Sequence, residues 1–192
     1  MPHRFAKLVS LAAIAVLGLS SGAFAHPGHE GGLTGGLAHP FTGLDHVLAM
    51  VAVGLWASQL GRPAMWLLPA VFPVVMAGGA LLGANGVALP FVELGIVASV
   101  VVLGAAVAFG LRVSLTLSAA LVGVFALFHG HAHGAELPAA GSALLYGTGF
   151  VAATLVLHAV GVGIGALAQR TFVLRTAGGA IAATGLLLLV TQ

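Results

Sequence analysis

Two histidines and an aspartate occur close together in the segment HPFTGLDHVLAM, which begins at His39. Asp45 and His46 stand at the start of an apolar run, and His39 precedes that run. Ionisable side chains at membrane depth are costly and commonly mark a functional site. Imidazole nitrogens beside a carboxylate suit a borderline divalent cation such as Ni²⁺, Co²⁺ or Zn²⁺. The segment therefore predicts a metal site formed by these three side chains; the alternative is that Asp45 only caps a helix and the histidines are interfacial.

A second histidine-rich motif, FHGHAHGAELP, ends a later apolar stretch. If a helix continues through it, His129 and His133 are four residues apart and face the same way. That spacing suits two ligands on one ion, and Glu136 could add an oxygen ligand. His131 would then point elsewhere. Two alternatives remain: the glycines of the motif could break the helix and bring His131 inward, or the motif could be a polar outer loop.

Two further candidates lie inside apolar stretches. Glu93 is one turn into an apolar segment, and we expect it to be buried. His158 lies past the middle of another such segment, on one helical stripe with Thr154 and Phe150. Each could be a ligand further along a metal path, and a titrating imidazole could also carry protons. The alternative for His158 is a hydrogen-bonded core residue.

The composition identifies an integral membrane protein. Hydrophobic residues make up 60% of the chain and charged residues 5%, against about 25% charged residues in a soluble domain. Nine histidines stand beside only six basic and four acidic residues. There is no cysteine, which excludes disulfides and thiolate chemistry, and no basic run, which argues against a nucleic-acid partner.

The N-terminus has the pattern of a secretory signal peptide over residues 1–25. Arg4 and Lys7 precede an apolar run, and an Ala-Phe-Ala site ends at Ala25. Cleavage there would leave an extracytoplasmic segment, residues 26–42, whose His26 and His29 could bind metal weakly. The alternatives are an uncleaved first helix and a tail without a metal role.

Six membrane-spanning helices are expected to form one domain over residues 43–192, which makes the fold an all-α polytopic helix bundle. Each predicted span is about the 20 residues that a helix needs to cross a bilayer. Two prolines inside the second span are expected to kink it. The spans are placed near Gly43–Leu60, Ala64–Gly83, Pro90–Gly110, Val113–His129, Gly141–Leu167 and Thr171–Thr191.

Basic residues indicate the orientation of these spans. Arg62, Arg112, Arg170 and Arg175 fall in alternate loops, and they are all the basic residues that follow the signal peptide. The positive-inside rule places those loops in the cytoplasm. We therefore expect a bacterial inner-membrane protein with both mature termini in the periplasm and with the histidine motifs near the periplasmic face.

Glycine pairs predict close contacts between helices. Gly79 and Gly83, and likewise Gly161 and Gly165, are four residues apart on their spans. Small residues at this spacing let membrane helices approach one another closely. We interpret these glycines as packing residues.

The two motifs and the signal peptide followed by HPGH resemble the HupE/UreJ family of nickel and cobalt transport proteins, over essentially the whole chain. The resemblance implies metal residues at His39, Asp45 and His46, and at His129 and Glu136 with their neighbouring histidines. It also implies Ni²⁺ or Co²⁺ as a transported ion, no permanently bound cofactor, and hydrogenase or urease maturation proteins as partners. The spacing His-x5-Asp-His differs from the His-x4-Asp-His of the larger nickel/cobalt transporter family, which argues against that assignment.

The sequence thus predicts a permease that imports a divalent metal ion. A membrane metallochaperone or sensor, which would bind metal without flux, is the main alternative. An enzyme is not expected, because no HExxH motif, Walker loop or nucleophile–base set is recognisable. No pattern in the sequence sets the oligomeric state.

Overall fold

The computed structural model describes residues 31–137, 142–168 and 171–191. These residues form helices and no strands, which confirms the all-α prediction. The predicted signal peptide, His26 and His29 lie outside the described residues. The elements are α2 (Leu33–Ala38), η1 (His39–Phe41), α3 (Leu44–Leu60), α4 (Arg62–Ala84), α5 (Val92–Phe109), α6 (Leu115–Ala135), α7 (Ala143–Leu167) and α8 (Thr171–Thr191).

Five of these helices, α4 to α8, are long and apolar enough to cross a membrane. A sixth span results if α2, η1 and α3 are counted together, since they pass the same test as a pair of helices bent by 82°. The chain is therefore a multi-pass membrane protein. The first expected span differs from a simple helix, because α3 has 17 residues and follows a sharp break.

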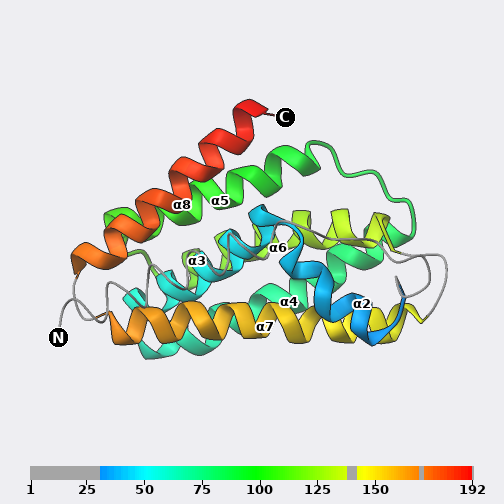
Figure 1. Ribbon diagram of the computed structural model, residues 1–192, viewed down its shortest axis with the longest axis horizontal. Helices are drawn as coiled ribbons and strands as arrows, with labels where there is room; N and C mark the ends of the chain where they lie inside the picture. Colours follow the sequence, from blue (N-terminus) through cyan, green and yellow to red (C-terminus); the bar gives the residue numbers. More distant parts are fainter. Residues whose placement is uncertain (1–30, 138–141, 169–170, 192) are drawn as a thin grey trace.

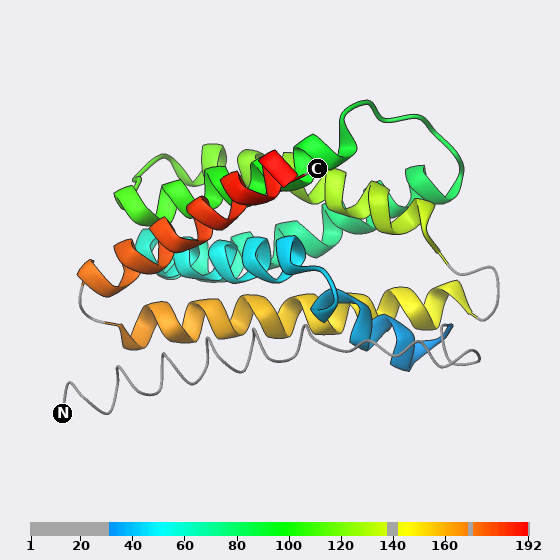
Figure 2. The ribbon, with the colours of Figure 1, turned by 45° about the horizontal axis from the view of Figure 1, so that its top comes forward.

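The long helices pack in pairs. α3 lies along α7, α4 lies along α6, and α5 lies along α8. The α5–α8 pair forms one edge of the bundle, away from α7 (Figure 1, Figure 2). α2 covers the first turns of α7, which places the break before α3 against the middle of the bundle. Residues of α3, α4, α6 and α7 then meet around a common interior.

Glycines allow the backbones of α4 and α6 to approach each other closely. A Cβ atom on Gly79 or Gly83 would collide with backbone atoms of α6, and one on Gly130 or Gly134 would collide with backbone atoms of α4. The predicted packing role of the first pair is confirmed. α6 continues to Ala135, so the predicted end of the fourth span at His129 was too early. The alternative in which the motif glycines break the helix was also wrong. These glycines instead provide the surface on which α4 and α6 meet.

Glycines also allow α3 and α7 to pack closely together. A Cβ atom on Gly54 or Gly161 would collide with the backbone of the facing helix, and one on Gly165 would overlap the Ser58 side chain. The predicted packing role of Gly161 and Gly165 is confirmed. At the far end of α3, the Trp56 indole N–H donates to the backbone carbonyl of Leu111 at 2.9 Å. This end of the bundle is thus closed by apolar packing and hydrogen bonds.

Candidate metal centre

The start of α3 lies deep in the bundle. Gly43 precedes the helix in an extended conformation, and His46 is the third residue of α3, only 1% exposed. Its Nε2 lies 3.4 Å from the hydroxyl of Thr154, which is the twelfth of 25 residues in α7. The sequence predicts this motif near the periplasmic face, and the structure shows that His46 itself is buried inside the bundle. The bend between η1 and α3 starts the helix partway along α7, where a broken helix is tolerated because its ends are buried in protein.

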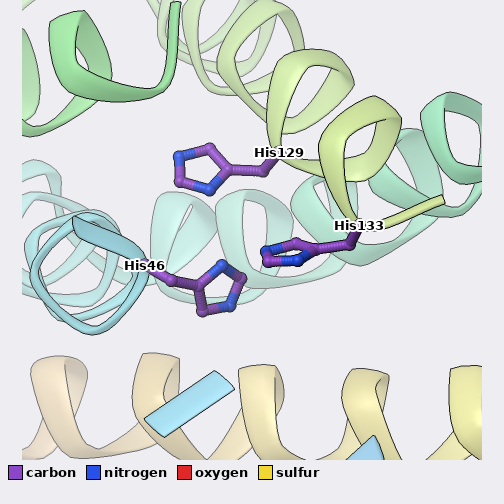
Figure 3. Close-up of side chains that lie close together, drawn as sticks. All are labelled: His46, His129 and His133. Atoms are coloured by element: carbon purple, nitrogen blue, oxygen red, sulfur yellow. The ribbon is translucent and has the colours of Figure 1, made fainter. Parts of the chain in front are cut away.

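His46, His129 and His133 converge on one point. Each offers a ring nitrogen, and these three nitrogens lie within 4.8 Å of one another. The ring centroid of His46 is 5.3 Å from that of His129 and 5.2 Å from that of His133 (Figure 3). The two motifs thus meet through His46 and His129, and the predicted shared face of His129 and His133 on a continuous α6 is confirmed. We call these residues the three-histidine group.

A second group connects this site to the surface. His39, His133 and Glu136 also have ligand atoms within 4.8 Å of one another. The His39 Nε2 lies 3.2 Å from the His133 Nδ1, and the His133 Nδ1 lies 3.9 Å from a carboxylate oxygen of Glu136. The Glu136 side chain is 65% exposed, the His133 side chain is 19% exposed, and His46 is buried. His133 belongs to both groups and therefore links an exposed carboxylate with a buried imidazole pair.

Ser99 of α5 fixes the orientation of His129. The Ser99 hydroxyl donates to the Ile96 carbonyl at 2.5 Å, so its oxygen accepts from the His129 Nε2–H at 2.9 Å. The His129 Nδ1 must then carry the lone pair, and it has no hydrogen-bond partner among the described residues. A buried nitrogen without a partner is unfavourable unless a ligand occupies it. Sequence reasoning missed Ser99, whose only signal is a lone hydroxyl within an apolar helix.

Aromatic rings of α4 and α7 pack against the three-histidine group. The Phe150 ring lies 5.1 Å from the His46 ring and 4.6 Å from the His133 ring, measured between centroids. The Phe72 ring lies 5.7 Å from the His129 ring. An apolar cavity of about 620 Å³ between α4, α6 and α7 reaches the site at His133. The interior around the imidazoles is therefore low in dielectric constant, which strengthens any interaction with an ion.

Other predicted ligands lie apart from both groups. Asp45 accepts a hydrogen bond from the backbone N–H of His46 at 2.6 Å, as a first-turn residue of α3. The His131 Nε2 donates to the Val87 carbonyl at 2.7 Å and so ties α6 to the chain before α5. Glu93 is exposed in the first turn of α5, so its expected burial was wrong. The hydropathy pattern placed Glu93 one turn inside the span. In the structure α5 begins at Val92, so Glu93 is only its second residue.

The three-histidine group has the chemistry of a site for a borderline divalent cation. Neutral imidazoles bind Zn²⁺, Ni²⁺ and Co²⁺, whereas Mg²⁺ and Ca²⁺ prefer oxygen ligands. No carboxylate belongs to this group, so the charge of a bound ion would not be fully compensated there. An incompletely compensated site favours exchange of the ion over permanent retention.

Comparison with known proteins agrees with this description. The family model described as HupE / UreJ protein matches residues 14–188. Protein HupE of Rhizobium leguminosarum bv. viciae is 51% identical over 181 residues, a match that covers 92% of this chain and 95% of that relative. No solved structure matches the chain. The chain therefore belongs to the HupE/UreJ family.

Proposed function

We propose that this protein is a secondary transporter that imports Ni²⁺, or Co²⁺, across the bacterial inner membrane, and that it is not an enzyme. The observation that carries the proposal is the graded series of ligands from Glu136 through His133 to His46. A permanently bound structural ion would need no such series. A transported ion needs one, because it must exchange its waters for protein ligands in steps.

The residues take successive roles along this series. Glu136 attracts the hydrated cation, and His39 and His133 replace the first waters. His46 and His129 then complete an imidazole site inside the bundle. Asp45 lies in the first turn of α3 beside His46, where its negative charge lowers the cost of bringing a cation into the interior.

The membrane potential supplies a driving force. Inward movement of positive charge yields about 2.3 kcal/mol per elementary charge per 100 mV, so transport needs no ATP. We expect the arginine-bearing end to face the cytoplasm. The link between Trp56 and Leu111 supports this orientation, because it brings the chain preceding Arg112 to the end of α3, near Arg62. The histidine groups then lie toward the periplasmic side, with both mature termini there and His26 as the first mature residue.

The imported ion would supply hydrogenase or urease maturation proteins. A membrane metallochaperone or sensor is the second candidate, and the burial of the three-histidine group also suits retention of an ion. The two candidates differ in one measurable property, which is the movement of metal across a sealed bilayer.

The test is Ni²⁺ uptake into proteoliposomes that contain only this protein, with an inside-negative potential. We expect uptake by the wild type, loss of uptake in His46→Ala, and normal uptake in His131→Gln, a histidine outside both ligand groups. Binding of Ni²⁺ without uptake by the wild type would favour the metallochaperone or sensor. Equal uptake by wild type and His46→Ala would exclude the site.

A further inference from the structure

His158 is the least explained polar side chain of the interior. It is 0% exposed, and neither ring nitrogen has a hydrogen-bond partner among the described residues. Buried imidazoles without partners are rare because their desolvation is uncompensated. The residue is absent from both ligand groups described above.

His158 continues a stripe of buried side chains along α7. Tyr146, Phe150, Thr154 and His158 follow one another at intervals of four residues, and all four are buried. The first two contact the imidazole of His39, and the Thr154 hydroxyl lies 3.4 Å from the His46 Nε2. Residues four apart on a helix have Cβ atoms about 5–6 Å from one another. His158 is therefore one helical turn beyond the three-histidine group.

Two prolines of α4 expose a backbone oxygen at the same depth. Pro73 has no N–H, so the carbonyl of Pro69 lacks its usual helical partner. This carbonyl lies within interaction range of the His158 ring, although no hydrogen bond of ordinary geometry joins the two groups. The Phe72 ring lies between the three-histidine group and His158. Its centroid is 5.7 Å from that of the His129 ring and 5.3 Å from that of the His158 ring. A carbonyl oxygen without its helical donor and a buried imidazole thus lie close together in the interior of the bundle.

We propose that His158 and the Pro69 carbonyl form a second, deeper station for the divalent cation, which receives it from the three-histidine group by way of Thr154. The inference rests on the proposed transport function. One imidazole and neutral oxygens hold such an ion more weakly than three imidazoles. A weaker site beyond the three-histidine group, in the direction of transport, would let the ion dissociate. Conduction requires such release of the ion. The two prolines of α4 then supply an oxygen ligand.

The test counts the Ni²⁺ ions bound by purified protein in lipid nanodiscs, using equilibrium dialysis. We expect His158→Leu to bind one ion fewer than the wild type, while the tightest site keeps its Kd within about twofold. Pro73→Ala, which returns a donor to the Pro69 carbonyl, should weaken the same ion and leave every histidine in place. His131→Leu serves as the matched control and should bind the full number.

Uptake into proteoliposomes separates this inference from the proposed function. We expect His158→Leu to reduce uptake at least about tenfold, since release would become slow. A wild type without uptake would refute the transport function and leave the ion count to decide on the station. The station itself is refuted if His158→Leu binds as many ions as the wild type. If His158→Leu does not fold, unchanged weak binding in Pro73→Ala refutes it.

Discussion

The imidazoles of His46 and His129 lie 5.3 Å apart between centroids, although the residues are 83 positions apart in the sequence and belong to α3 and α6. Two features of the backbone bring them together. The break at Gly43 starts α3 inside the bundle, and the glycines of α4 and α6 let those helices approach closely. The convergence of the three-histidine group thus depends on these glycines as well as on the histidines.

The hydrogen bond and the negative charge of Asp45 can be tested separately. Asp45→Asn keeps an oxygen that can accept from the His46 N–H, but it removes the negative charge. We expect normal membrane insertion and a fall in Ni²⁺ uptake of at least about tenfold, which corresponds to roughly 1.4 kcal/mol of lost interaction with the ion. Uptake is compared at matched protein levels in proteoliposomes. Wild-type uptake by Asp45→Asn would leave Asp45 only its hydrogen bond in the first turn of α3.

Ser99 is expected to act on metal affinity through His129. Ser99→Ala removes the acceptor of the His129 Nε2–H, so the ring can rotate or change tautomer. Partners of this kind typically contribute about 10–100-fold to metal affinity. We expect a loss of this size in the Ni²⁺ Kd, measured by calorimetry on purified protein.

Ser118→Ala is the matched control for Ser99→Ala. Ser118 is also a buried serine, but it bonds the Ser114 carbonyl within α6 and lies in neither ligand group. It should leave the Kd unchanged. Equal affinities in the two variants would show that Ser99 does not position the ligand.

Part of this arrangement could be predicted from the sequence. The i, i+4 spacing of His129 and His133 is a local property of a helix, and it correctly indicated a shared face. The depth of His46 could not be predicted, because hydropathy reports which residues are apolar and not where the chain bends. The exposure of Glu93 could not be predicted for a similar reason. The span was expected to start at Pro90, but α5 starts two residues later, at Val92, and Glu93 is exposed in its first turn. Ser99 is defined only by a contact with a distant helix.

Neighbouring glycines on α4 give a paired test of helix packing. A Cβ atom on Gly79 would overlap the α6 backbone, whereas one on Gly78 would meet nothing within 4 Å. We expect Gly79→Ala to lower the free energy of unfolding by about 1–3 kcal/mol, as overpacking commonly does. Gly78→Ala should leave it unchanged or raise it by about 0.5–1 kcal/mol, because alanine is the better helix former. Thermal unfolding in one detergent compares them, and equal midpoints would contradict the close contact.

Competition between metals tests the donor set of the three-histidine group. Imidazole nitrogens favour Ni²⁺, Co²⁺ and Zn²⁺, while Mg²⁺ and Ca²⁺ require several oxygen ligands and lose their waters reluctantly. We therefore expect Co²⁺ and Zn²⁺ at concentrations similar to Ni²⁺ to inhibit its uptake into proteoliposomes. A large excess of Mg²⁺ should affect only the attraction of the ion to the exposed Glu136 carboxylate, as screening by any salt would. Specific inhibition by Mg²⁺ at constant ionic strength would mean that oxygen ligands dominate the site. In that case Glu136 and Asp45, and not the imidazoles, would control which ion enters.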